Sequence, residues 1–184
     1  MSLREAKLKE KLTYADYLLL PDDGYIYQII DGELHMAPAP SPYHQRISRN
    51  IEFLLWSFVS KNGLGEILDS PCDVVLSPQD IVQPDLLFIS RDRSHIIGER
   101  YIEGPPDLIV EILSPSTVEL DRKHKKELYQ RYGVKEYWIV DPNRKEVEVY
   151  TLEGGRYSLH GRFGANESLN SPLLGLTVSL REVF

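Results

Sequence analysis

A single carboxylate inside an apolar strand constrains this chain more than any other feature. Residues 107–113 read DLIVEIL between Pro-Pro and Ser-Pro, which is typical of a buried strand. Side chains alternate along a strand, so two sets face opposite sides: Leu108, Val110 and Ile112, and then Ile109, Glu111 and Leu113. A carboxylate among aliphatic side chains is unfavourable unless it is paired, protonated or bound to a metal, so Glu111 needs a partner.

The following segment predicts a helix that supplies this partner. Ser116 and Glu119 have the spacing of a capping box, and Gly133 marks the helix end. The helical period places four residues on one face: Asp121, Lys125, Leu128 and Tyr132. Lys125 is the only basic residue of this helix on that face, so we expect it to meet Glu111. The two residues form either an ordinary buried ion pair or part of a reactive site.

Composition sets the broad class of the protein. A chain of 184 residues, 42% hydrophobic and 27% charged, is typical of one soluble globular domain. The single cysteine excludes a disulfide framework and a cysteine zinc site. The net charge of -7 argues against a dedicated nucleic-acid binder, because phosphate contacts dominate such binding. It is compatible with an enzyme whose metal site needs acidic residues.

The sequence also predicts the cellular location. No run approaches the ~20 apolar residues of a membrane span, and the charged first twelve residues lack the apolar core of a signal peptide. We therefore expect a cytoplasmic protein with no membrane partner.

Upstream segments predict a hairpin, a long helix and a second strand with a carboxylate. Asp-Gly at 31–32 suits a type I′ turn between two strands. Ser41 and a following proline open a helix to about residue 61, with His44 on its inward stripe. Residues 81–89 (IVQPDLLFI) predict one longer strand, in which Pro84 marks a bulge or an edge and Asp85 precedes the apolar run. Residues 136–140 and 147–151 predict a later hairpin.

The order of these features resembles a known nuclease group. Pro84-Asp85, then Glu111, then a lysine in the next helix resembles the PD-(D/E)XK restriction-endonuclease-like superfamily, and more narrowly its Uma-type branch of bacterial endonucleases. The matching text is YQIIDGELHMAPAPSPYHQ, VVLSPQDIVQPDLLFIS, PPDLIVEILSPST and DRKHKKELYQRYGVKEYWIVDP.

The resemblance implies an α/β (α+β) fold, with a central mixed β-sheet flanked by helices. It further implies a single restriction-endonuclease-like domain over residues 1–184. Within it, residues 1–40 are an N-terminal helix and hairpin, 41–151 the nuclease core, and 152–184 a C-terminal extension.

A metal site follows from the same resemblance. Its ligands are Asp85, Glu111 and the backbone carbonyl of Ile112, holding Mg²⁺ or Mn²⁺. Two carboxylates from adjacent strands suit such a hard cation. Lys125 orients or activates the attacking water and offsets charge on the transition state.

Three further residues bear on this expectation. Leu113 stands where the parent pattern has lysine, two residues after the glutamate. In the Uma-type branch the lysine lies in the following helix, and the resemblance assigns this position to Lys125. Glu33 and His44 stand where that branch also has a glutamate and a histidine, so both are auxiliary candidates beside the metal. The aromatic residues near the site are predicted core residues: Tyr129, Tyr132, Tyr137 and Trp138.

The expected function is divalent-metal-dependent endonuclease activity on nucleic acid, most simply DNA, by a homodimer. The alternative is a catalytically weak or inactive nuclease-fold module that binds or regulates. A third interpretation takes Asp85, Glu111 and Lys125 as a structural ion-pair network. A basic groove beside the carboxylates favours nucleic acid, and its candidates are Arg91, Arg93, Arg100 and Lys123.

Overall fold

The computed structural model describes residues 11–184, so most of the charged N-terminal segment discussed above lies outside the described residues. A six-stranded mixed sheet forms the centre of the molecule, in the order β11-β10-β9-β8-β6-β3. Its strands are β3 (Gly65–Asp69), β6 (Leu86–Ser90), β8 (Leu108–Ile112), β9 (Glu136–Asp141), β10 (Glu146–Glu153) and β11 (Arg156–Gly164). β8 and β9 run parallel, and the other neighbours in this sheet run antiparallel.

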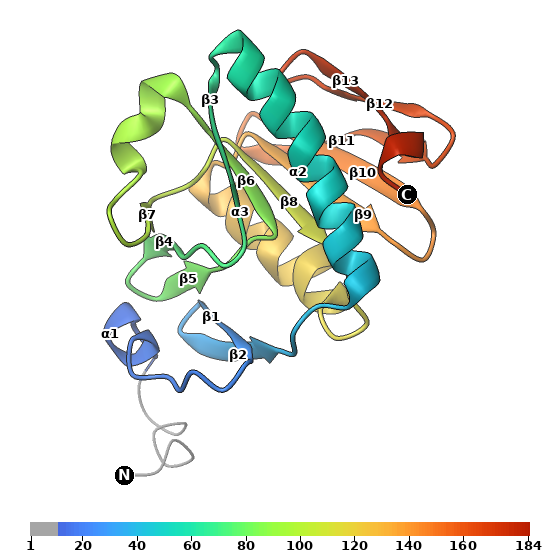
Figure 1. Cartoon of the computed structure of the whole chain (residues 1–184). Coiled ribbons are helices and arrows are strands. Elements are labelled where there is room, and N and C mark those ends of the chain that lie inside the picture. The colour runs from blue at the N-terminus through green and yellow to red at the C-terminus, as the bar shows by residue number, and fades with distance from the viewer. Residues whose placement is uncertain (1–10) are drawn as a thin grey trace.

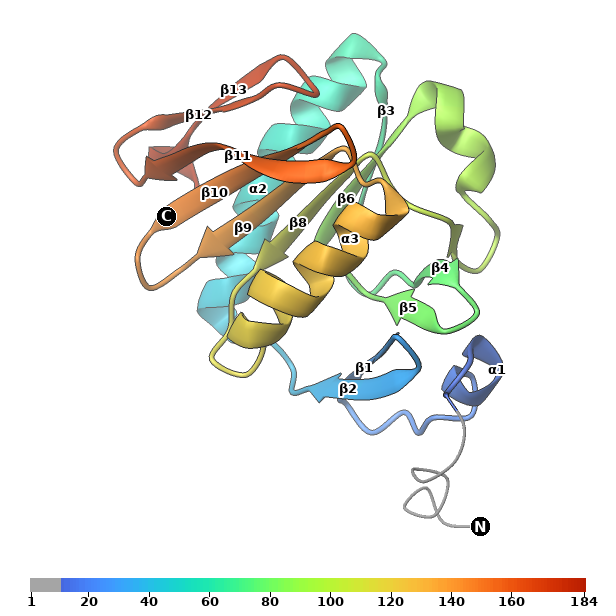
Figure 2. The same cartoon turned by 180° about the vertical axis from the view of Figure 1, so that it is seen from behind.

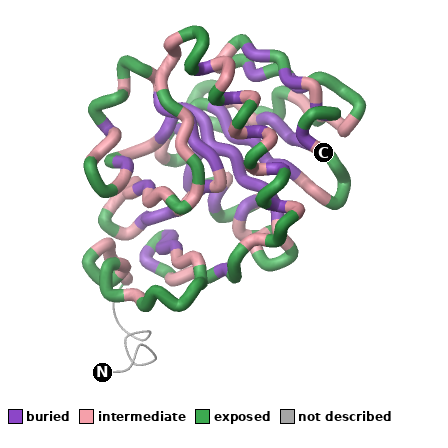
Figure 3. The backbone as a smooth tube through the Cα atoms, viewed as in Figure 1, coloured by how far each residue is buried: buried purple, intermediate pink, exposed green. Residues whose placement is uncertain are grey.

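Helices cover both faces of this sheet (Figures 1 and 2). On one face lies α2 (Pro42–Asn62), which begins at the Ser41 cap and ends at Gly63, as predicted. On the other lies a π-helical segment (Leu120–Lys125) that continues into α3 (Lys126–Tyr132). The alternation predicted for β8 is confirmed, because Val110 packs in the core beneath α2 and Ile109 packs in the core beneath α3. Figure 3 shows the buried residues concentrated in these central strands.

A second sheet lies beside the first, in the order β2-β1-β5-β4-β7. Its strands are β1 (Ile26–Ile30), β2 (Glu33–Ala37), β4 (Val74–Ser77), β5 (Asp80–Val82) and β7 (Ile102–Glu103). Asp31 and Gly32 both have positive φ, at 52° and 78°, so the predicted type I′ turn is confirmed. The short helix α1 (Tyr14–Tyr17) precedes this hairpin. Two 3₁₀ helices (Arg91–Ile96 and Leu180–Glu182) and the hairpin β12 (Ser168–Ser171) and β13 (Leu176–Ser179) complete the described chain.

The single strand predicted over residues 81–89 is wrong. The segment divides into β5, in the second sheet, and β6, in the central sheet. The break falls at residues 83–85, because Pro84 has no N–H to donate to a strand ladder. Asp85 therefore sits where the chain crosses between the sheets, with its carboxylate free for other contacts.

The capping box predicted at Ser116 and Glu119 is also wrong. The Ser116 hydroxyl lies 3.0 Å from the Ser114 hydroxyl, and no side chain caps the π-helical segment. The Ser114 carbonyl instead accepts hydrogen bonds from the N–H groups of Thr117 and Val118. Hydroxyl side chains close to one another offer the backbone local alternatives to a helix cap, and here they form a turn. The end of the helix is as predicted, with Gly133 in the left-handed conformation.

A helix that crosses a bilayer needs about 20 predominantly apolar residues. Within residues 11–184, none combines sufficient length and apolar character to cross a membrane.

Candidate active site

Glu111 lies on the α3 face of β8 and is only 3% exposed. Its Oε1 atom accepts a hydrogen bond from the Tyr129 hydroxyl at 2.6 Å and lies 3.0 Å from Lys125 Nζ. Both contacts go to the same oxygen. Among the described residues, Oε2 is therefore the carboxylate atom left without a protein donor. The predicted meeting of Glu111 and Lys125 is present.

Lys125 has a second carboxylate partner. Its Nζ lies 3.1 Å from Asp121 Oδ1, and both side chains are 2% exposed. Burial alone would lower the pKa of Lys125, but Asp121 and Glu111 outweigh it and hold the pKa above its ordinary value. Lys125 is therefore a cation and a hydrogen-bond donor at neutral pH, and not a base.

Asp121 was not assigned a role from the sequence. Its signal was present, since it lies four residues before Lys125 on the inward face. The π-helical segment that carries both residues is anchored by the Tyr137 hydroxyl, which donates to the Asp121 carbonyl at 3.0 Å. Wide turns of this kind are frequent at functional sites, where they alter which side chains point inward.

The aromatic residues beside the site are core residues, as predicted for Tyr129, Tyr137 and Trp138. The rings of Tyr129 and Tyr137 pack edge to face, with centroids 5.2 Å apart. Sequence reasoning missed the second role of Tyr129, whose hydroxyl holds Glu111. A tyrosine on the inward face one turn after a predicted catalytic lysine is the signal that could have found it.

The protonation of Glu111 reflects its surroundings. Burial raises its pKa to about 8, although the Lys125 ammonium acts in the opposite direction. That value includes the negative charges of Asp121 and Asp85, which also raise it. Three carboxyl groups therefore crowd around one lysine, and this crowding favours the protonated form of Glu111.

Asp85 approaches the same place from the crossing between the sheets. Its Oδ2 accepts the Ile112 N–H at 2.7 Å, and its Oδ1 lies 3.0 Å from His44 Nε2. The N–H and C=O of one strand residue point to the same side, so the Ile112 carbonyl also lies on the Asp85 side of β8. His44 is held in the first turn of α2, where its N–H donates to the Ser41 hydroxyl. Its Nδ1 is buried and has no hydrogen-bond partner among the described residues.

A cavity of about 520 Å³ lies over this group. It is bounded by β1 and residues 38–41 on one side, and by residues 113–117 and 142–143 on the other. Its lining includes five histidine, carboxyl and lysine side chains: His44, Asp85, Glu111, Asp121 and Lys125. Four of the five side chains predicted for the site therefore line one cavity: His44, Asp85, Glu111 and Lys125. Asp121, which was given no role from the sequence, lines it too.

Glu33 is not part of this group. It is exposed at the first position of β2, opposite Ile30, and it does not line the cavity.

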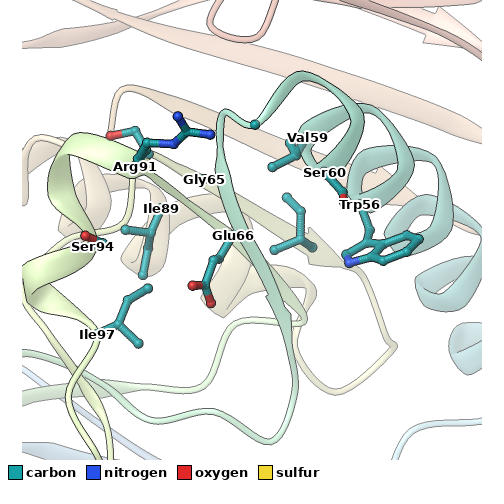
Figure 4. Close-up of a pocket in the computed structure, with 12 residues that line it drawn as sticks. Trp56, Val59, Ser60, Gly65, Glu66, Ile89, Arg91, Ser94 and Ile97 are labelled. Atoms are coloured by element: carbon teal, nitrogen blue, oxygen red, sulfur yellow. The ribbon is translucent and has the colours of Figure 1, made fainter.

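The basic groove is absent from the same cavity. None of its four candidates lines the cavity: Arg91, Arg93, Arg100 and Lys123. Arg93 instead pairs with Asp107 at 3.0 Å. Arg91 lies beside a second cavity of about 400 Å³ at the other end of β6, together with Trp56 and Glu66 (Figure 4). The feature that would have favoured nucleic acid over the binding module is therefore not found at this cavity.

The residues present fit a hard divalent cation. No group of three or more His, Cys, Asp or Glu side chains in residues 11–184 is arranged to hold a metal. A Mg²⁺ site, however, needs only one or two carboxylates, with waters and substrate oxygens completing the shell. Asp85 and Glu111 supply these carboxylates at one cavity wall, and Glu111 Oε2 is without a protein donor. Carboxyl groups crowded around one lysine are the electrostatic condition for such an ion.

Comparisons with known proteins bear on the fold and the family. A family model described as "Uma2: Putative restriction endonuclease" matches residues 14–181. The crystal structure of "a putative nuclease belonging to DUF820" from Anabaena variabilis ATCC 29413 superposes with a TM-score of 0.76 at 19% identity, covering 94% of this chain and 97% of that chain. At this identity the likeness shows a shared fold. None of the curated proteins compared with the chain matches it.

Proposed function

Because the chain belongs to the Uma2 family, whose printed description is "Putative restriction endonuclease", we propose that it is a divalent-metal-dependent endonuclease acting on DNA. The observation that carries the proposal is the enclosure of Asp85, Glu111 and Lys125 in one cavity. In the proposed reaction, water adds across one P–O bond of the backbone. One fragment then ends in a phosphate monoester and the other in a hydroxyl group.

Mg²⁺ or Mn²⁺ would be held by Asp85, Glu111 and the carbonyl of Ile112. When bound, the ion supplies Lewis acidity, which polarises the scissile phosphate and makes water more acidic. The chain's own contribution is to hold these ligands still. His44 and the Ile112 N–H fix the two oxygens of Asp85, while Tyr129 and Lys125 fix one oxygen of Glu111.

Lys125 contributes a fixed positive charge. It is protonated and clamped between Glu111 and Asp121, so it donates hydrogen bonds instead of removing a proton. A preorganised cation of this kind stabilises the negative charge that develops on the phosphate oxygens. Asp121 acts through Lys125, as a positioning residue.

A second candidate function is favoured by one specific observation. None of the four candidates for a basic groove lines the cavity, and the one lysine or arginine of the described residues that does, Lys125, already contacts two carboxylates. A nuclease-fold module that binds or regulates, with little or no cleavage, is compatible with that charge balance.

The test is cleavage of supercoiled and single-stranded DNA by the purified protein with Mg²⁺ or Mn²⁺. We expect metal-dependent cleavage that Glu111→Gln and Lys125→Ala abolish. Lys123→Ala is the matched control, because Lys123 is exposed on the same helical segment and does not line the cavity. Calorimetric Mn²⁺ binding without cleavage would favour the binding module, and absence of both would reject the metal site.

We also propose that the protein acts as a homodimer, the commonest symmetric assembly of soluble proteins. Light scattering coupled to size exclusion measures this directly. A mass of one chain across the working concentration range contradicts it.

A further inference from the structure

The charge of the cavity wall limits which nucleic acid it can hold. Among the described residues, Lys125 is the one lysine or arginine that lines the cavity, and its Nζ already contacts Glu111 and Asp121 of the same wall. Proteins that grip a duplex neutralise several phosphates with lysine and arginine, and this dominates their affinity. Binding energy for a substrate at this wall must therefore come largely from contacts to something other than phosphate.

The remaining wall offers apolar and aromatic surface. Ile26 of β1, Tyr43 of α2 and Leu113 after β8 all line the cavity, with prolines from residues 38–40. Bases that stack on such side chains bind without sequence preference, because every base has an apolar face. In a duplex those faces are already stacked against neighbouring base pairs.

One wall residue can read a base edge. Gln28 lines the cavity and is 4% exposed. Its Oε1 accepts the Gln83 N–H at 3.2 Å, and no other described residue accepts a hydrogen bond from its amide nitrogen. A glutamine amide can hydrogen-bond the Watson–Crick edge of a base that lies outside the helical stack. The pairing edge of a base is open only when the base is unpaired.

The size of the cavity agrees with these contacts. Its volume of about 520 Å³ lies in the range of pockets that enclose one small ligand. Its lining comes from several segments far apart in the chain, among them β1, residues 38–41 and residues 113–117.

We infer that the substrate presents an unpaired nucleotide to this cavity, as a single strand or a loop, with its base against Tyr43 and Gln28 and its phosphate at Asp85 and Glu111. This inference rests on the proposed nuclease function and names the substrate class for the same site.

The test compares one labelled oligonucleotide as a single strand, as a perfect duplex, and as a duplex with an unpaired loop, using the metal-loaded full chain. We expect kcat/KM for the single strand and the loop to exceed that for the duplex by at least about tenfold, because unpairing a base costs free energy. Equal or faster cleavage of the duplex overturns the inference and leaves the endonuclease proposal intact.

Fluorescence anisotropy with the same three oligonucleotides separates the two proposals. Tighter binding of the single strand without any cleavage supports the inference and contradicts the nuclease proposal. Equal binding of all three, or none, without cleavage contradicts both.

Two variants test the wall itself. We expect Gln28→Leu and Tyr43→Leu each to raise KM for the single strand several-fold while kcat changes little. Tyr25→Leu is the control, since Tyr25 is exposed and does not line the cavity. Thermal melting first establishes which variants fold. If one of the two wall variants does not fold, the other still tests the inference. An unchanged KM in every folded wall variant overturns the inference.

Discussion

The parallel strands β8 and β9 carry buried carboxylates at both of their ends, but the hydrogen bonding of these carboxylates differs between the ends. Those at the starts of the strands, Glu136 and Asp107, form the sealed end, and Glu111, beside the cavity, lies at the open end. At the start of β9, Glu136 accepts hydrogen bonds from Trp138 Nε1 at 2.7 Å and the Ser171 hydroxyl at 2.6 Å. Its second oxygen accepts the Leu173 N–H at 2.9 Å. Both oxygens are therefore satisfied, and they dock the β12–β13 hairpin onto the central sheet.

Asp107, just before β8, is satisfied in the same way. It pairs with Lys135 at 2.7 Å and with Arg93 at 3.0 Å, and it accepts the Ser90 N–H at 2.9 Å. Glu111, toward the other end of β8, has two donors on one oxygen and a cavity before it. In open α/β sheets ligands bind outside the carboxyl ends of strands, where loops diverge and leave space. The comparison teaches that burial alone does not fix how a carboxylate is used: Glu136 has donors on both oxygens, whereas Glu111 keeps Oε2 without a protein donor beside the cavity.

The largest expected effect on stability comes from removing the positive charge of Lys125, beside the cavity at the open end. Lys125→Met leaves two buried carboxylates, Glu111 and Asp121, without their counter-ion. We expect a loss of about 3–5 kcal/mol in unfolding free energy. Mn²⁺ should restore part of it, since a ligand that binds only the folded state stabilises that state. Urea unfolding with EDTA and with Mn²⁺ measures both, and a loss that Mn²⁺ leaves unchanged contradicts the metal site.

At the sealed end the effect should be confined to stability. Glu136→Ala leaves the Trp138, Ser171 and Leu173 donors buried without an acceptor, so we expect a loss of about 2–3 kcal/mol. The specific activity of the folded fraction should not change. Urea unfolding and kinetics on the same preparation check this, and a lower kcat at full folding would erase the contrast between the ends.

Tyr129→Phe sharpens the comparison by removing one donor from Glu111. We expect about 1–1.5 kcal/mol of lost stability, together with a several-fold lower kcat at unchanged KM, because Glu111 is less firmly oriented. Tyr150→Phe is the matched control, since its hydroxyl donates to Glu148 away from the cavity. Equal kinetic effects in both variants would count against a positioning role for Tyr129.

The smallest effect is a dependence on pH. Burial raises the pKa of Asp107, but Lys135, the Ser90 N–H and Arg93 outweigh it, so the pKa lies below its ordinary value. A carboxyl with a depressed folded pKa contributes stability above its unfolded pKa of about 3.9, and that contribution is lost as pH falls through the folded pKa. We expect Asp107→Asn to remove this acid-side slope, worth about 1 kcal/mol. Acid titration of both proteins by circular dichroism measures it, and parallel curves contradict the assignment.

Much of the site could be read from local pattern. Strand alternation placed Glu111 on one face of β8, and helical periodicity placed Lys125 toward it. The Asp-Gly turn and the Ser41 cap were predicted for the same reason. These features depend on backbone geometry within a few residues, so the amino-acid sequence by itself determines them.

Only the tertiary structure decided the rest. His44 meets Asp85 across 41 positions of chain, and Tyr129 meets Glu111 across 18. The crossing at Pro84 and the π-helical segment adjust where these side chains point, and Arg91 turns to the opposite end of β6. Such contacts are set by how two sheets and two helices pack together. Sequence spacing carries little information about that packing, because the free energy of burial is summed over many side chains and does not depend on any one pair.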